Sequence, residues 1–378
     1  MKKIIILLLM LLPIMVQAEE KPQLAKSAVA SILMENSTGK ILYENNANER
    51  LAPASMTKVM TLLLIMEALE GGKIKTSDEV LITPNAASMG GSQVFLEAGS
   101  KMKIDDLLKA IAIASANDAS VAMAEHLNGS VSEFVKRMNE KCKAIGCTNT
   151  NFINVHGLDD INHYTSAHDM ALMARELLKY EKVLFYTSIY EEYLKKPDGT
   201  STWMVNTNKL IKYYNGLDGL KTGYTSSAGY CLTATAKRSN MRLISVVMKE
   251  SNPNSRSNDT LELLNYGFSN YKVKTILDIK KDLGTVEILN GKVKVMSLRL
   301  VNDATVLENI NEEKKYSYAI NVKPVKAPVM VGDVVGYLDV TENGKIIKTI
   351  NITVKEGVKK ANLWDLYQRN FKTILTGS

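Results

Sequence analysis

The feature that most constrains the fold is an apolar stretch near the start of the chain. Residues 59–69 carry apolar side chains almost all round a helix, so a helix over residues 55–70 has no face suited to water. Gly71 and Gly72 follow directly and predict where this helix ends. Other elements have to cover such a helix, which predicts that it lies buried at the centre of a domain.

The segments around this helix predict a sheet flanked by helices. Turn-forming residues at 36–40 lie between two short apolar segments, which favours a β-hairpin within residues 27–44. Helical patterns dominate residues 104–180. Strand-like segments follow at 202–205, 230–236 and 243–248, and a helix at 259–268. This order predicts an α/β (α+β) domain in which early and late strands meet in one antiparallel sheet.

The pattern changes after about residue 274. Asn290-Gly291 and Asn343-Gly344 each lie between alternating apolar segments, which is typical of β-hairpins. We therefore predict a larger mixed domain over residues 19–275 and a small all-β domain over residues 276–357.

The first 18 residues resemble a secretory signal peptide. Lys2 and Lys3 precede an apolar run over residues 4–16, and small residues end at Ala18, where cleavage is expected. An uncleaved anchor is the alternative, although the run is short for a spanning helix. Cleavage would change the net charge from +7 to +5, since two lysines leave. This diffuse positive charge fits an exported protein and gives no indication of nucleic-acid binding.

The last segment, residues 358–378, is predicted to form an amphipathic helix. Between Ala361 and Leu375 the aromatic and aliphatic side chains fall within half a turn, and Lys359 and Lys360 precede them. Such a helix can lie in a membrane interface. The alternative is a helix docked on the β domain.

The cysteines do not indicate a disulfide framework or a metal site. Cys142, Cys147 and Cys231 cannot all pair, although the first two could close a short loop. The simplest interpretation is that all three fill apolar positions. No metal-ligand cluster or nucleotide motif is present, so no cofactor and no metal are expected.

Ser55 and Lys58 are the first candidate chemical groups. Pro53 suits a helix entry, and positions three residues apart share a helical face, so the hydroxyl and the amine would be neighbours. A desolvated lysine can take the proton of a serine nucleophile. The same Ser-x-x-Lys spacing recurs elsewhere, however, at Ser37–Lys40, Ser100–Lys103 and Ser269–Lys272.

Two further motifs distinguish Ser55 from these other matches. Ser115-Ala116-Asn117 and Lys221-Thr222-Gly223 each occur once, after Ser55–Lys58, and are expected in a loop between helices and on a strand. This ordered set resembles the penicillin-binding proteins and serine β-lactamases. Helix caps at 115–117 and a solvated strand end at Lys221 are the structural alternatives.

Chemical roles follow from these residue types. Ser55 would attack a carbonyl, with Lys58 as its base, and Ser115 would relay a proton to the leaving amine. Asn117 would hold the substrate amide. Lys221 and the Thr222 hydroxyl would bind a carboxylate, and Gly223 would let a substrate backbone lie against the strand.

The resemblance narrows to the low-molecular-weight D-alanyl-D-alanine carboxypeptidases. Val155-His156-Gly157-Leu158 and Gly219–Gly223 look like that family's motifs, and the β domain and C-terminal helix fit its layout. The resemblance implies a serine-type enzyme that removes the terminal D-alanine from peptidoglycan stem pentapeptides and that β-lactams acylate. It also implies an oxyanion hole formed by the N–H groups of Ser55 and Tyr224.

Three residues around this pocket are weaker candidates. Tyr224 follows the third motif and would touch substrate. Arg256 falls where the family often places a basic residue near the carboxylate pocket, although residues 252–258 also read as a polar loop. His156 is expected to support the site structurally rather than to act as a catalyst.

Rival functions use the same motifs. A β-lactamase with a separate deacylating base needs a glutamate in a pocket loop, and Glu125 lies too close to Asn117 to be that residue. A D,D-endopeptidase would use the same chemistry on crosslinks. A non-catalytic wall-binding protein would not need Lys58.

Overall fold

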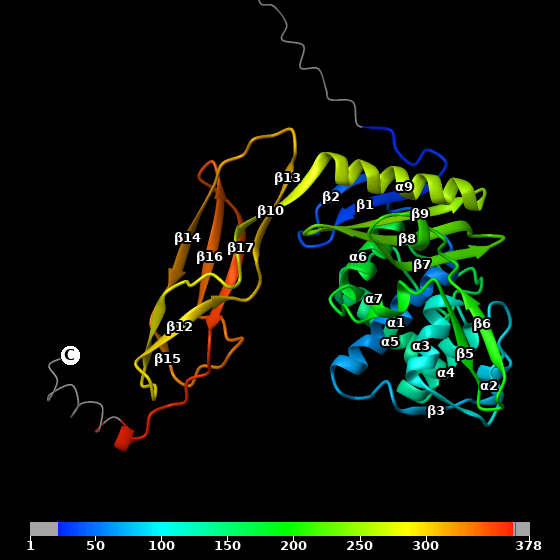
Figure 1. The fold of residues 1–378 in the computed structure, drawn as a ribbon, viewed down its shortest axis with the longest axis horizontal. Helices are drawn as coiled ribbons and strands as arrows, with labels where there is room; N and C mark the ends of the chain where they lie inside the picture. The colour runs from blue at the N-terminus through cyan, green and yellow to red at the C-terminus, as the bar shows by residue number, and fades with distance from the viewer. Residues whose placement is uncertain (1–21, 366, 368–378) are drawn as a thin grey trace, which may run out of the picture.

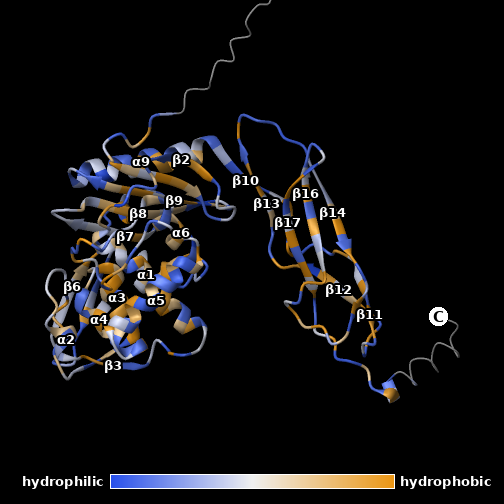
Figure 2. Cartoon of the chain, turned by 180° about the vertical axis from the view of Figure 1, so that it is seen from behind, coloured by the Kyte–Doolittle hydropathy of each residue, from blue (hydrophilic) through white to orange (hydrophobic). Residues whose placement is uncertain are grey.

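The structure, a computed structural model, describes residues 22–365 and 367, in a larger mixed part and a smaller β part (Figure 1). The predicted signal peptide and most of the predicted C-terminal helix lie outside these residues. Apolar segments concentrate on the central helices and strands of the larger part, whereas apolar and polar residues alternate along the smaller part's strands (Figure 2). No helix among the described residues is long and apolar enough to cross a membrane.

The larger part is built on one antiparallel sheet with the strand order β2-β1-β9-β8-β7. Its strands are β1 (Ala30–Glu35), β2 (Ile41–Asn45), β7 (Leu217–Thr225), β8 (Gly229–Arg238) and β9 (Met241–Glu250). The predicted meeting of early and late strands is therefore confirmed. Helix α9 (Pro253–Asn270) covers one face of the sheet, and the helices around α1 lie on the other (Figure 1).

Most of the remaining elements form a helical layer around α1 (Lys58–Glu70). The other helices are α2 (Pro84–Ala87), α3 (Ile104–Ile113), α4 (Asn117–Asn128), α5 (Val131–Ala144), α6 (Ala167–Leu177), α7 (Val183–Thr187) and α8 (Leu210–Tyr213). Two small two-stranded antiparallel sheets accompany them, β3 (Glu79–Leu81) with β4 (Lys101–Lys103) and β5 (Glu191–Lys195) with β6 (Ser201–Val205). Ten of the thirteen residues of α1 are buried, which confirms its central position.

Two helix boundaries differ from the sequence prediction. The helix predicted over residues 55–70 begins as α1 at Lys58, after a separate 3₁₀ turn, η1 (Ala54–Thr57). The helix predicted over residues 259–268 begins at Pro253, because Asn252 caps it by accepting a hydrogen bond from the Ser255 N–H. Residues 253–258 are therefore helical rather than a polar loop.

The smaller part contains its own apolar core. Its strands are β10 (Tyr271–Leu277), β11 (Thr285–Leu289), β12 (Val295–Leu300), β13 (Ala304–Asn309), β14 (Tyr316–Val322), β15 (Val325–Lys326), β16 (Gly336–Glu342) and β17 (Lys345–Val354). Both Asn-Gly hairpins are present. The second is a two-residue turn with positive φ at Asn343 and Gly344, the geometry that this residue pair favours.

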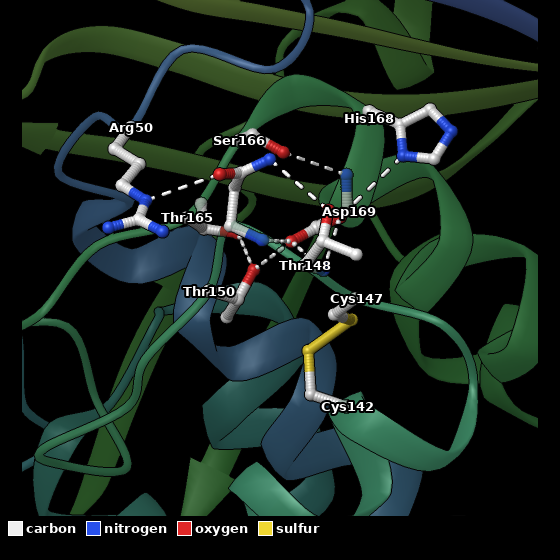
Figure 3. A network of polar contacts seen from close by, with 10 residues as sticks. Arg50, Cys142, Cys147, Thr148, Thr150, Thr165, Ser166, His168 and Asp169 are labelled. Atoms are coloured by element: carbon white, nitrogen blue, oxygen red, sulfur yellow. Dashed lines mark hydrogen bonds and ion pairs between the residues drawn. A yellow bond between two sulfur atoms is a disulfide. The ribbon is translucent and has the colours of Figure 1, made fainter.

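The interpretation of the cysteines is wrong for two of the three. Cys142, in the last turn of α5, forms a disulfide with Cys147, whereas Cys231 is free and buried. The backbone that follows the disulfide is held by Asp169, whose carboxylate accepts hydrogen bonds from the Thr148 and Asn149 N–H groups (Figure 3). Sequence spacing could not show that the chain between the two cysteines turns back on itself.

Candidate active site

Ser55 lies in the 3₁₀ turn η1, on a constrained backbone. Ala54, directly before it, has a left-handed φ of 46°, which is uncommon for a residue with a side chain. The Thr57 hydroxyl donates to the Ala54 carbonyl at 2.8 Å. Gly157 packs so closely against this turn that a Cβ there would lie 1.8 Å from the same carbonyl oxygen. The turn is therefore held from within and from outside.

Lys58 reaches Ser55 from the first position of α1 and is fully buried. Its Nζ lies 2.9 Å from Ser55 Oγ, 2.7 Å from Asn117 Oδ1 and 2.7 Å from the His156 carbonyl oxygen. Burial, and then the nearby Lys221, holds the pKa of Lys58 well below its usual value. A neutral amine would donate its two N–H bonds to the amide and carbonyl oxygens. Its lone pair would then face the Ser55 hydroxyl, as a general base requires.

Ser115 and Asn117 approach from the junction between α3 and α4. Ser115 has a φ of 62°, and its buried Oγ has no hydrogen-bond partner among the described residues. Asn117 begins α4, and its amide nitrogen donates to the Gly90 carbonyl at 2.7 Å while its oxygen accepts from Lys58. In this structure the Asn117 side chain thus orients Lys58, and its contact with a substrate amide stays a prediction.

The third motif lies on β7, which packs against η1. Lys221 is 1% exposed, and burial followed by the charge of Arg256 lowers its pKa to about 7. The Thr222 hydroxyl donates to Thr207 Oγ1 at 2.7 Å. A Cβ at Gly223 would lie 2.7 Å from the Pro53 carbonyl oxygen, so glycine is required here for packing against the nucleophile turn.

The three weaker candidates lie at different depths. Tyr224 is 55% exposed, and its ring centroid lies 4.3 Å from that of Tyr230. Arg256 is buried on the first turn of α9, and its Nε has no hydrogen-bond partner among the described residues. His156 contacts Lys58 through its backbone carbonyl, while its ring Nδ1 accepts from the Leu158 N–H at 3.2 Å. Burial lowers the pKa of His156 to about 4.

Three residues near the site were not identified from the sequence. Thr57 and His163 contact each other below the nucleophile turn. Asp118 is fully buried, and its carboxylate accepts the N–H groups of Val94 and Leu96, which fixes the segment after Gly90 beside the site. Asp118 lies next to the second motif and could have been noted for that reason, but nothing in the sequence pattern distinguishes His163.

The three sequence motifs, which contain Ser55, Ser115 and Lys221, lie together at one site. A hydroxyl beside a desolvated amine, a second buried hydroxyl and a second buried cation are the groups that acyl transfer through a serine ester requires. Within residues 22–365 and at 367, no cluster of three or more His, Cys, Asp and Glu residues could hold a metal ion.

Comparison with known proteins agrees with this chemistry. The family model of the D-alanyl-D-alanine carboxypeptidases matches residues 15–252, and that of the penicillin-binding protein 5 C-terminal domain matches residues 271–360. The chain belongs to the D-alanyl-D-alanine carboxypeptidase family. The carboxypeptidase DacF of Bacillus subtilis is 47% identical over 352 residues, which cover 92% of this chain and 90% of DacF.

Solved structures of this family share the fold. Penicillin-binding protein 5 of Haemophilus influenzae superimposes with a TM-score of 0.72 at 33% identity, covering 91% of this chain and all of that one. The ampicillin-bound penicillin-binding protein D2 of Listeria monocytogenes gives a TM-score of 0.58 at 30% identity, covering 64% of this chain and 98% of its own. The expected fold and activity, those of a serine-type D-alanyl-D-alanine carboxypeptidase, are confirmed.

Proposed function

We propose that this carboxypeptidase removes the terminal D-alanine from peptidoglycan stem pentapeptides through an acyl-enzyme on Ser55. The observation that supports this best is the set of contacts at Lys58, whose two acceptor partners leave its lone pair for the Ser55 hydroxyl. Ser55 Oγ attacks the carbonyl of the penultimate D-alanine, and its proton passes to Lys58.

Ser115 completes the transfer. Its buried hydroxyl, which has no hydrogen-bond partner among the described residues, is available to pass its proton to the amide nitrogen as the C–N bond breaks and to take in return the proton that Lys58 accepted from Ser55. Free D-alanine leaves, and the acyl group stays on Ser55 as an ester. Water then attacks the ester carbonyl and gives a proton to the neutral Lys58, which passes it to Ser55 Oγ as the ester bond breaks, so that the Ser55 hydroxyl is regenerated.

Substrate binding is assigned to the cationic side of the site. Lys221 and Arg256 are buried cations without an acidic partner within ion-pair distance in the described part, so a substrate carboxylate would supply the missing charge. The Thr222 hydroxyl would exchange its contact with Thr207 for this carboxylate. Tyr224 is exposed enough to touch the stem peptide, and the N–H groups of Ser55 and Tyr224 would bind the oxyanion.

A single substitution tests the nucleophile. The protein lacking residues 1–18 is incubated with a pentapeptide ending in D-Ala-D-Ala, and free D-alanine is measured. Ser55→Ala should release none above background and should form no adduct with labelled penicillin. Ser269→Ala is the matched control, because exposed Ser269 belongs to another Ser-x-x-Lys match and should retain full activity. D-alanine release by Ser55→Ala would refute the assignment.

The same assay separates the rival activities. The described site offers no carboxylate within hydrogen-bond distance of Ser55 or Lys58 that could activate water for fast deacylation. We therefore expect the penicillin adduct to persist for many turnover times of the peptide. Rapid turnover of penicillin would indicate a β-lactamase, and faster cleavage of a crosslinked dimer than of the pentapeptide would indicate an endopeptidase.

The enzyme is further proposed to act outside the cytoplasm, attached to the membrane surface through residues 358–378. Support comes from the signal-like residues 1–18 and from the start of the C-terminal segment, where Leu363 and Trp364 are largely exposed. Deleting residues 358–378 should move the protein from the membrane fraction to the soluble fraction without changing peptide hydrolysis. Unchanged membrane association would show that this segment is not the anchor.

A further inference from the structure

A directional chain of hydrogen bonds runs beneath the nucleophile turn. The Ile153 N–H donates to His163 Nδ1 at 3.0 Å, so the ring proton of the neutral imidazole lies on Nε2. His163 Nε2 lies 2.8 Å from Thr57 Oγ1 and donates to it. The Thr57 hydroxyl therefore directs its own proton to the Ala54 carbonyl, 2.8 Å away. Each group in the chain has one remaining direction in which to donate.

The end of this chain fixes one peptide unit. The Ala54 carbonyl and the Ser55 N–H belong to the same peptide, which is trans, so they point in opposite directions. Holding the carbonyl toward Thr57 turns the Ser55 N–H to the other side of the backbone. The left-handed φ of Ala54 makes this orientation unfavourable without support, because L-residues rarely adopt it.

We propose that His163 is a positioning residue for catalysis: acting through Thr57, it aims the Ser55 N–H at the oxyanion that forms during acyl transfer. This inference rests on the proposed role of Ser55. An oxyanion donor stabilises the transition state more than the bound substrate, so its misalignment should lower kcat rather than raise KM.

The surroundings of His163 keep its ring in this role. The side chain is 2% exposed, and its ring makes an edge contact with Phe152 at a centroid distance of 5.8 Å. Asp159 and Asp160 are the charged groups that face it, yet burial outweighs them and lowers the pKa of His163 to about 4. The imidazole is thus neutral at neutral pH, as the acceptor contact with the Ile153 N–H requires.

Two substitutions separate the donor role from simple packing. His163→Gln places an amide N–H near the position of Nε2 and can still donate to Thr57. His163→Asn places its oxygen near Nδ1, accepts the Ile153 N–H and cannot reach Thr57. The acylation rate with labelled penicillin, and kcat and KM with the pentapeptide, are measured for both. Removing one oxyanion donor entirely lowers rates about 10²–10³-fold, so misaligning it should lower them about tenfold or more.

The expected result is a split between the two variants. His163→Asn should lose about tenfold or more in acylation rate and kcat with KM within about twofold, whereas His163→Gln should stay within about threefold of the parent. Equal losses in both variants, or a loss confined to KM, would overturn the proposal. Melting temperatures of both variants identify any loss that comes from unfolding.

Thr57 supplies an independent check. Thr57→Val removes the hydroxyl at nearly constant shape, and Thr57→Ser retains it. Thr57→Val should match the loss of His163→Asn, Thr57→Ser should recover most of it, and the double variant His163→Asn with Thr57→Val should lose no more than either alone. Additive losses would show that His163 does not act through Thr57. An active Ser55→Ala protein would instead refute the proposed function beneath both.

Discussion

The two parts of the molecule bury their side chains in different ways. The larger part buries most of α1 and encloses charged and polar groups, among them Lys58, Lys221 and Asp118. The smaller part alternates buried and exposed residues along strands such as β16 and β17, and its core is almost wholly apolar. The first arrangement produces desolvated, reactive groups, and the second produces a stable support.

This difference has a thermodynamic reason. A buried cation is unfavourable unless neighbouring groups compensate it, and the compensating contacts restrict where its proton can go. Lys58 satisfies this requirement with two fixed oxygen acceptors and becomes a base. The apolar side chains of the smaller part gain free energy simply by leaving water. Core substitutions in the larger part should therefore change the reaction rate as well as stability. Core substitutions in the smaller part should change stability alone.

Replacement of Lys58 should have the largest effect on the chemistry. Lys58→Met removes the base and leaves Asn117 Oδ1 and the His156 carbonyl without their donor. The acylation rate with labelled penicillin should fall about 10³-fold, within the range for loss of a general base. The control is Lys40→Met, at an exposed lysine of another Ser-x-x-Lys match, which should leave the rate unchanged. An acylation rate within tenfold of the parent would argue against Lys58 as the base.

The second expected effect is that of Ser115. Ser115→Ala should lower kcat for the pentapeptide about 100-fold, because a relay hydroxyl is lost while Ser55 and Lys58 remain. Its Oγ makes no hydrogen bond within the described part, so the melting temperature should change little. Steady-state kinetics and thermal unfolding measure the two quantities. A large loss of stability with normal kcat would indicate a structural role instead.

A smaller, pH-dependent effect is expected at Lys221. Its pKa is lowered to about 7, so the charged form predominates below pH 7 and is lost as the pH rises above it. If the ammonium binds the substrate carboxylate, KM should increase above pH 7, by at most about tenfold per pH unit. Lys221→Gln should show a raised KM at pH 6 without this increase. A KM that stays constant in the parent from pH 6 to 9 would contradict the assignment.

The sequence predicted the parts of the fold that depend on residues close together in the chain. The central helix, the antiparallel sheet and the Asn-Gly hairpins followed from periodicity and turn chemistry, which act over a few neighbouring residues. The motifs around Ser55, Ser115 and Lys221 were found because their order is distinctive, and the structure brings them together.

The features that were missed depend on contacts between distant segments. The left-handed φ of Ala54 is held by Gly157 and by the chain through Thr57 and His163, about a hundred residues away. The contact of Asn117 Oδ1 with Lys58 was not expected from the sequence, and the contact of Asn117 with the substrate stays a prediction. Local sequence patterns do not reveal such long-range contacts, so they could not show which of these side chains contact each other.

The smallest effect on activity is expected from a core substitution in the smaller part. Ile352 is fully buried on β17, so Ile352→Ala should lower the free energy of unfolding by about 3 kcal/mol by removing apolar contacts and leaving a cavity. The acylation rate at 25 °C should stay within about twofold of the parent, because this core contains none of the groups around Ser55. Leu63→Ala in α1 is the matched variant, since it should lower stability similarly and also slow acylation by loosening the helix that carries Lys58. Thermal unfolding and penicillin acylation, measured on both variants, test the division. A slow acylation rate in folded Ile352→Ala would show that the two parts are coupled in catalysis as well as joined in the chain.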